Sequence, residues 1–229
     1  MSKTLKQICD AAGIRSSLGK QSSYFGSGDE TLAYLANEAV AELVRHPWQL
    51  LRTEGTVAMT TATTYALPSD ILYFVSDTMN ADGQERFIKF PTATDDFWYH
   101  KTHSPSGIRY KIRLSGDLIE ILNPDSGIDL KFEYISNLCI KESGEDGVTA
   151  SLTEFENDEN VWCLDDELLI KDLKWRYKRE KGIEGWEADK MIFNEYITKL
   201  KGQEAGSRSL DFSGGGQPIN AIPYTDLYV

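Results

Sequence analysis

The sequence predicts an α+β protein in which N- and C-terminal helices form one helical bundle, an antiparallel β domain is inserted between them, and an extended C-terminal arm follows. Two observations predict this fold. Hydrophobic residues recur with the helical period near both ends of the chain and alternate with the strand period in the middle. Beyond the last helix, Gly, Ser and Asn become frequent. The expected segments are bundle 1–53, β domain 54–140, acidic connection 141–164, bundle 165–203 and arm 204–229.

Length and composition exclude several classes of protein. The chain has 229 residues, of which 41% are hydrophobic, so it can bury a core. Its 36 acidic and 24 basic residues give a net charge of -12, which repels phosphate and argues against specific nucleic-acid recognition. The apolar runs are far shorter than the ~20 residues that cross a bilayer, and no signal-like apolar stretch opens the chain. We expect a protein that is made in the cytosol and binds no membrane.

Two helices are predicted in the N-terminal part. The first runs from about Thr4 to Ala12 and ends at Gly13. The second begins at Asp29, its expected N-cap, and stops before Pro47. Its apolar residues have helical spacing and form one continuous stripe: Leu32, Leu35, Ala36, Ala39, Val40, Leu43 and Val44.

Strand-like alternation is clearest between Ile108 and Ile135. Apolar residues alternate with basic ones in Ile108–Leu114 and with mostly acidic ones in Ile128–Tyr134. Turn residues on both sides of Leu118–Leu122 predict a middle strand, so we expect the three strands to form an antiparallel meander. The other elements predicted here are strands at Thr56–Thr61, Ile71–Val75 and Arg86–Phe90, and a one-turn helix or loop at Thr94–Tyr99.

Two further helices are predicted at about Asp165–Lys181 and Gly185–Lys201, the second ending at Gly202. The first of them interleaves aromatic and basic residues. Such a stretch can clamp a nucleic acid. It can also pack its aromatic side in the bundle while its basic end meets acids of a neighbouring subunit. We favour the second interpretation, with the inter-subunit residues Trp175, Arg176, Lys178 and Arg179.

The segment after Gly202 carries too much apolar surface for a purely solvated tail. Fully extended at ~3.3 Å per residue, it spans ~90 Å, which is enough to reach a neighbouring molecule. We expect it to be an arm that binds a partner, and the alternative is that it folds back over its own β domain. The residues expected to bind are Phe212, Ile219, Ile222, Tyr224, Leu227 and Tyr228.

Residue patterns typical of catalysis or metal binding are weak. His100 and His103 can lie on one helical turn near Asp95 and Asp96, but no third ligand is fixed by spacing, and two surface histidines are the more ordinary interpretation. The acids Glu154, Glu156, Asp158 and Glu159 lack the glycine and spacing of a calcium loop. No nucleophile elbow is present. The cysteines Cys9, Cys139 and Cys163 are odd in number and widely spaced, as reduced thiols are. We therefore expect no enzyme activity, metal or cofactor.

Several short motifs occur in an order that resembles a known family. The chain resembles the head-to-tail adaptor proteins of short-tailed bacteriophages, the tail accessory or tail tubular A type of ring protein. The pieces that carry the resemblance are Gly28-Asp29, Leu35-Ala36-Asn37-Glu38, Leu67-Pro68-Ser69-Asp70, Phe132-Glu133-Tyr134-Ile135-Ser136, Asp165 to Gly182 with its Leu-Lys-Trp-Arg-Tyr-Lys-Arg core, and Arg208-Ser209-Leu210.

The resemblance implies a structural protein of the virion, without catalysis, located at the head–tail interface. It implies a homo-oligomeric ring, expected to be a dodecamer, which binds the portal protein above and tail nozzle or fibre proteins below. The arm would contact the portal or an adjacent subunit. One alternative is a virion-associated cell-wall glycan hydrolase that uses an acid such as Glu154 or Glu156. Another is a carbohydrate-binding β module with Trp98 and Tyr99 exposed.

Overall fold

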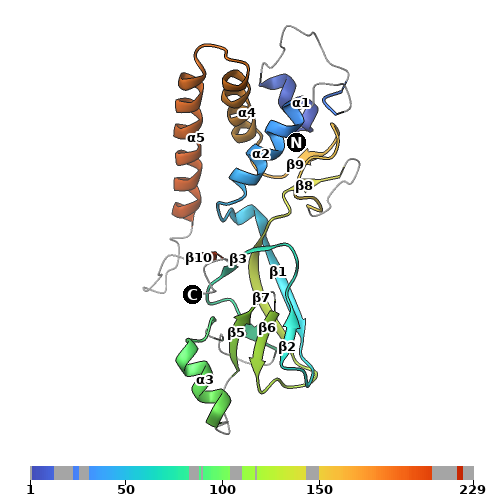
Figure 1. Ribbon diagram of the computed structural model, residues 1–229, viewed down its shortest axis with the longest axis vertical. Coiled ribbons are helices and arrows are strands. Elements are labelled where there is room, and N and C mark those ends of the chain that lie inside the picture. Colours follow the sequence, from blue (N-terminus) through green and yellow to red (C-terminus); the bar gives the residue numbers. More distant parts are fainter. Residues whose placement is uncertain are drawn as a thin grey trace. The chain divides into compact units, whose positions relative to one another are not determined.

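The computed structural model of the chain describes residues 2–12, 23–25, 31–82, 88, 90–103, 110–116, 118–142, 150–207 and 221–223. It contains both helices and antiparallel sheets, so the predicted α+β class is confirmed (Figure 1). The chain divides into two compact units. The helical unit comprises Met1–Leu50 and Asn137–Gly214, and the β unit comprises Leu51–Ser136 and Gly215–Val229. The inserted domain predicted at 54–140 corresponds to the first part of the β unit.

The order of helices and strands along the chain follows the hydrophobic period of the sequence, which is helical near both ends and strand-like in the middle. The helical unit contains α1 (Leu5–Ala11), α2 (Thr31–Leu43), β8 (Ile140–Lys141), β9 (Val161–Trp162), α4 (Asp166–Glu180) and α5 (Trp186–Ser207). The 3-10 helix η1 (Gln49–Leu51) leads into the β unit, which contains β1 (Arg52–Ala58), β2 (Thr64–Ala66), β3 (Ile71–Val75), β4 (Asn80–Ala81), α3 (Thr94–His103), β5 (Lys111–Ser115), β6 (Leu118–Leu122), β7 (Asp129–Ser136) and β10 (Ala221–Pro223).

The first two helices form for the reasons that the sequence indicates. Thr4 caps α1 and forms a capping box with Gln7, and this satisfies two backbone donors of the first turn. The predicted apolar stripe of α2 is buried along its whole length. Gly13 and Asp29, the expected end of α1 and start of α2, lie outside the described residues.

In the helical unit, α4 packs against α1, α2 and α5, and Figure 1 shows it between α5 and the other two. Asp165 is its N-cap, since its side chain accepts a hydrogen bond from the backbone N–H of Leu168. The prediction that Gly202 ends α5 is wrong, because the helix continues to Ser207. A single glycine costs a helix only about 1 kcal/mol, and Glu204, one half-turn later, accepts a hydrogen bond from the backbone N–H of Gln49.

The acidic segment 141–164 is more than an exposed connection. Its described part contributes Phe155 and Trp162 to the core, both almost fully buried. Strand β9 pairs with β8, and the side-chain amide of Asn37 in α2 exchanges two hydrogen bonds with the backbone of Phe155. The sequence did not reveal these buried positions, because the apolar residues of the segment are widely spaced among many acids and show neither a helical nor a strand period.

The β unit consists of two antiparallel sheets that share one core. One sheet has the strand order β1-β7-β3-β10, with β4 also paired to β7, and the other has the order β2-β6-β5. Val57, Phe74 and Phe132 from the first sheet meet Ile112 and Ile121 from the second in one buried cluster. Since the two sheets pack face to face there, strands such as β1 and the first part of β7 alternate buried and more exposed residues.

Three predictions for the β unit need correction. Strands β5 and β6 pair as expected, but β7 pairs with β1, β3 and β4, so the predicted three-stranded meander is wrong. Alternation shows which face of a strand is buried, and it does not show which strand lies beside it. Ile88 and Phe90, the two described residues of the strand predicted at Arg86–Phe90, are not in a strand. The helix α3 has ten residues where one turn or a loop was predicted.

Candidate functional site

The aromatic and basic stretch of α4 is the first candidate site. Trp175 and Tyr177 are 5% and 7% exposed, and Arg176 is only 3% exposed. The aromatic side of this stretch therefore packs in its own bundle, as the favoured interpretation expects. Trp175 and Arg176 keep little surface for a neighbouring subunit, whereas Lys178 is half-buried and Arg179 is exposed.

A buried charge network fixes this side of α4 against α2. Asp172 has no exposed surface, and it accepts hydrogen bonds from Nε of Arg176 (3.0 Å) and from Nε1 of Trp175 (2.6 Å). Arg176 also pairs with Glu42 and, at 3.6 Å, with Glu38. Burial raises the pKa of Asp172, and the guanidinium of Arg176 opposes this shift. The network thus joins α2 to α4 through buried and partly buried ion pairs.

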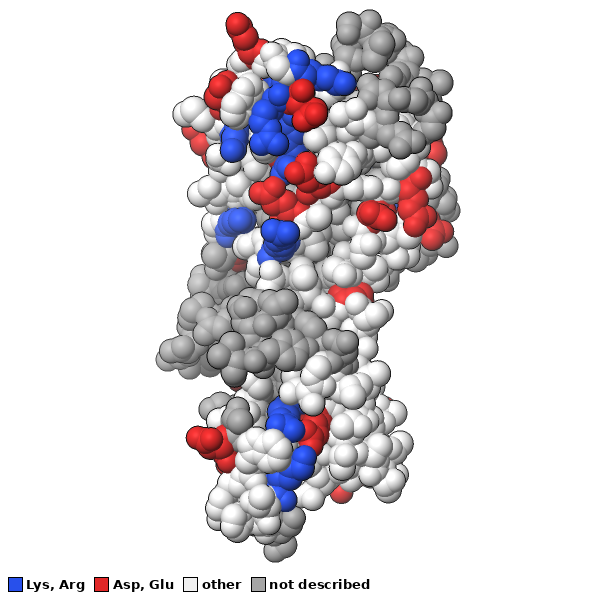
Figure 2. All heavy atoms as spheres, viewed as in Figure 1, with Lys and Arg blue, Asp and Glu red and all other residues white. Residues whose placement is uncertain are grey.

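A second charge cluster lies where α4 meets α5. The carboxylate of Asp189 in α5 forms ion pairs with Nζ of Lys174 (2.9 Å) and Nζ of Lys178 (2.5 Å). Burial alone would raise the pKa of Asp189, but the two lysines lower it. Lys171 lies 3.4 Å from Glu167 and above the ring of Tyr196. On the face that Figure 2 shows, Lys and Arg gather at the end of the helical unit where α4 and α5 are joined.

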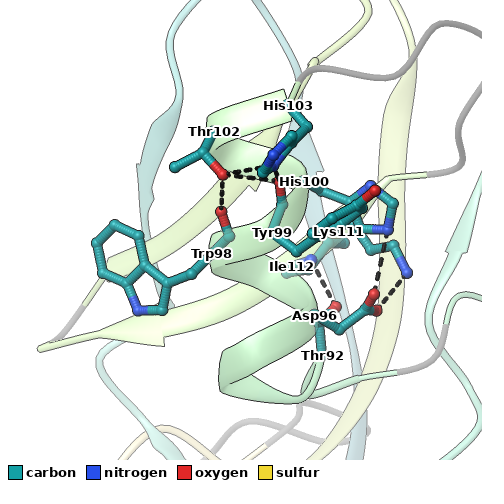
Figure 3. Close-up of polar contacts among 9 residues, drawn as sticks. All are labelled: Thr92, Asp96, Trp98, Tyr99, His100, Thr102, His103, Lys111 and Ile112. Atoms are coloured by element: carbon teal, nitrogen blue, oxygen red, sulfur yellow. Dashed lines mark hydrogen bonds and ion pairs between the residues drawn. The ribbon is translucent and has the colours of Figure 1, made fainter.

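The β unit carries a separate polar cluster on α3 (Figure 3). Asp96 accepts hydrogen bonds from Nζ of Lys111 (2.5 Å) and lies 3.1 Å from Nε2 of His100. The hydrogen bond from Lys111 lowers the pKa of Asp96. The backbone N–H of Ile112 donates to Oγ1 of Thr92. These contacts join α3 to strand β5.

The two histidines considered as metal ligands have different partners. His100 faces Asp96, whereas Nδ1 of His103 lies 2.9 Å from the carbonyl oxygen of Tyr99 and 2.8 Å from Oγ1 of Thr102 (Figure 3). His103 also stacks on the ring of Tyr99. Among the side chains that the structure describes, His, Cys, Asp and Glu form no group of three that could hold a metal ion.

Trp98, considered for carbohydrate binding, is 44% exposed and stacks with cations. The guanidinium of Arg113 lies 4.5 Å from the ring centroid, and Nζ of Lys101 lies 4.9 Å from it. Both cations donate hydrogen bonds to the buried Glu120, at 2.7 Å and 2.6 Å. Burial would raise the pKa of Glu120, but these two donors lower it. Trp98 therefore packs on two cations that pair with the buried Glu120 and so join α3 to the sheet.

Of the arm predicted at 204–229, residues 204–207 belong to helix α5 instead, and the remainder is described only at β10. Its backbone pairs antiparallel with β3, with Ile222 opposite Phe74. For these three residues, the structure shows the alternative in which the arm folds back over its own β domain. The other predicted binding residues of the arm, Phe212, Ile219, Tyr224, Leu227 and Tyr228, lie outside the described residues.

The acids considered for glycan hydrolysis, Glu154 and Glu156, are both exposed. A general acid of a glycosidase has a raised pKa, which burial among apolar groups produces. This exposed position does not favour such a role. The three cysteines are free thiols, as expected, and burial raises the pKa of both Cys9 and Cys139 to about 12.

Four of the motifs behind the family resemblance are joined in pairs in space, and the other two, Gly28-Asp29 and Arg208-Ser209-Leu210, lie outside the described residues. Asp70, the last residue of the Leu67–Asp70 motif, accepts hydrogen bonds from the hydroxyls of Tyr134 and Ser136 in the Phe132–Ser136 motif. Glu38, the last residue of the Leu35–Glu38 motif, pairs with Arg176 in the α4 motif. Each unit thus has one polar link between two motifs.

Three acids of these clusters, Asp172, Asp189 and Glu120, were not predicted from the sequence. Asp172 did carry a usable signal, because it lies four residues before the predicted site residue Arg176 and beside the apolar positions Leu169 and Leu173. Asp189 and Glu120 carried none, since each receives its partners from other elements of the chain.

Comparison with known proteins adds no assignment. No protein-family model and no curated protein matches the sequence. None of the described helices has both the length and the apolar character that a membrane span requires.

Proposed function

We propose that this chain is a structural head-to-tail adaptor of a bacteriophage virion. Copies of the chain form a ring, expected to be a dodecamer, below the portal, and the ring links the portal to tail nozzle or fibre proteins. The role needs no catalysis and no cofactor. The C-terminal arm holds the portal protein or a neighbouring subunit, and the protein acts at the head–tail interface after its synthesis in the host cytoplasm.

The observation that supports this proposal most is the spatial linkage of the family-like motifs. Motifs far apart in the sequence meet as Asp70 with Tyr134 and Ser136, and as Glu38 with Arg176. If the resemblance were accidental, residues of different motifs would not be expected to contact each other. Such contacts are expected if the motifs contain the polar residues that stabilise a shared fold.

The arm offers a second line of support. Strand β3 accepts an extended segment along its edge, here from residues 221–223 of the same chain. Strand addition is a common way for an arm to bind another protein, because the main-chain hydrogen bonds supply affinity without a preformed pocket. A partner chain can use the same mode in the assembled particle.

The proposal is tested by cosedimentation of the purified chain with assembled portal rings of the same phage. The full chain is expected to sediment with the portal, and a chain that lacks Phe212–Val229 is expected to lose most of this binding. A chain with Glu159→Lys, an exposed change in the acidic segment, serves as the control. Absence of portal binding by the full chain would contradict the proposal, and undiminished binding by the shortened chain would contradict the role of the arm.

A further inference from the structure

The helical unit carries two surfaces of opposite charge. On α4, Arg176 points to α2, where it pairs with Glu38 and Glu42. Lys174 precedes Arg176 by two residues, and two positions at 100° per residue place these side chains on opposite sides of the helix. Lys171 and Lys178 share the side of Lys174 by their spacing. The three lysines therefore lie on the side of α4 that is turned away from α2.

This lysine face, defined by Lys171, Lys174 and Lys178, retains positive charge. The lysine side chains are 28%, 44% and 29% exposed. They share two carboxylates, those of Glu167 and Asp189, so one positive charge remains in excess. Ile192 follows Asp189 by three residues on α5, hence on the same side, and it is 51% exposed.

The exposed surface of α2 and the acidic segment beside it form a second surface. The apolar stripe of α2 is buried, whereas Tyr34 is 69% exposed. Asn37, which follows Tyr34 by three residues, exchanges two hydrogen bonds with the backbone of Phe155. The acids on either side of Phe155 are therefore held next to α2. We call this surface the acidic face, and its acids are Glu38 and Glu42 of α2 and Glu154 and Glu156 of the segment.

The acidic face retains negative charge. All four of its acids are exposed. Two arginines lie near them, namely Arg176, which pairs with the acids of α2, and the exposed Arg45 just beyond the end of α2. When both arginines are counted against the four acids, two negative charges remain in excess. The acidic face and the lysine face are thus complementary in charge.

We infer that a second copy of the chain docks its acidic face on the lysine face of the first. The two faces have opposite charge, and each carries an exposed apolar or aromatic side chain. Such a contact is heterologous, so every copy keeps one face free for the next copy, and repetition gives a ring when the rotation between copies closes. The inference rests on the proposed function, for which it names the surface between neighbouring copies.

The test is a charge swap followed by analytical ultracentrifugation of the full chain. Wild-type protein is expected to self-associate at about 0.05 M salt and to dissociate at about 0.5 M salt, because the Debye length shortens. Glu154→Lys or Lys171→Glu alone is expected to weaken association about tenfold or more, since each places like charges opposite each other. An equimolar mixture of the two variants is expected to recover association, because each reversed face then meets its complement.

Two matched variants control for net charge. Glu54→Lys in the β unit and Lys201→Glu near the end of α5 make the same charge changes at exposed positions outside both faces, and they are expected to associate like the wild type. Circular dichroism and the Tm show whether each variant is folded. The inference is overturned if the wild type stays monomeric at every salt concentration. It is also overturned if Glu154→Lys and Lys171→Glu weaken association no more than their controls, or if the mixture of these two variants does not associate.

The inference and the proposed function can fail separately. If the chain forms a ring on the portal but the reversals have no effect, the adaptor function stands and this interface is refuted. If the charge swap works but no portal binding occurs, the interface stands and the adaptor function is refuted.

Discussion

Replacement of Arg176 by methionine isolates the energetic role of the buried network. The side chain of Asp172 has no exposed surface, and in the variant it keeps only the hydrogen bond from Trp175. Removing one partner of a buried ion pair leaves an uncompensated charge and typically costs about 3–5 kcal/mol. A folded domain is stable by only about 5–15 kcal/mol. We therefore expect Arg176→Met to remove a large part of the stability of the helical unit.

A second substitution tests the reason for this loss. In Arg176→Met combined with Asp172→Asn, no buried charge remains, and Oδ1 of the asparagine can still accept the hydrogen bond from Trp175. The double variant should regain about 2 kcal/mol relative to Arg176→Met alone. Arg179→Met removes an exposed arginine from the same helix and should cost about 1 kcal/mol or less.

Urea unfolding followed by far-UV circular dichroism measures these differences, because α1, α2, α4 and α5 all belong to the helical unit. The two units can unfold in separate steps, so the transition of the helices is fitted by itself. The reasoning is refuted if Arg176→Met costs no more than Arg179→Met, or if the double variant is no more stable than Arg176→Met.

Three other predictions concern single side chains. Glu120→Gln should cost about 1–3 kcal/mol at pH 7. The pKa of Glu120 is lower in the folded than in the unfolded protein. Its carboxylate therefore contributes to the free energy of unfolding above the unfolded pKa, and this contribution is lost as the pH falls through the folded pKa. A stability difference between Glu120→Gln and wild type that persists at acidic pH contradicts this. Gly55→Val should destabilise the β unit by about 1–3 kcal/mol, because a Cβ there would lie 2.6 Å from the ring of Phe132; an unchanged Tm refutes it. Burial raises the pKa of the Cys9 and Cys139 thiols to about 12. A thiol reagent should therefore label the half-buried Cys163 first and label Cys9 and Cys139 only when the protein unfolds. Rapid labelling of all three cysteines in the folded protein contradicts this.

The sequence predicted the helices better than the sheets. Local signals define α1 and α2, namely a capping box at Thr4 and an uninterrupted apolar stripe from Leu32 to Val44. The partner of β7 is a long-range property, and Leu130, Phe132 and Tyr134 would alternate in the same way beside any strand. Gly202 was a misleading stop signal, because an exposed glycine weakens a helix only slightly.

The candidate site was predicted in kind but not in detail. The packing of Trp175 and Tyr177 in the bundle followed from their positions on α4. The partners of the basic residues did not, because Glu42 and Asp189 belong to other helices and no spacing along α4 points to them. The lysine face could not be predicted because it depends on the orientation of α4. The contacts of Arg176 with α2 define that orientation.

The adaptor role is tested most directly by cryo-electron microscopy of the purified chain mixed with the portal ring of the same phage. The account predicts class averages with a second ring coaxial with the portal, in which neighbouring copies contact each other through the acidic face of one copy and the lysine face of the next. A portal that carries no added density, or a chain that remains a separate particle beside it, would contradict the account.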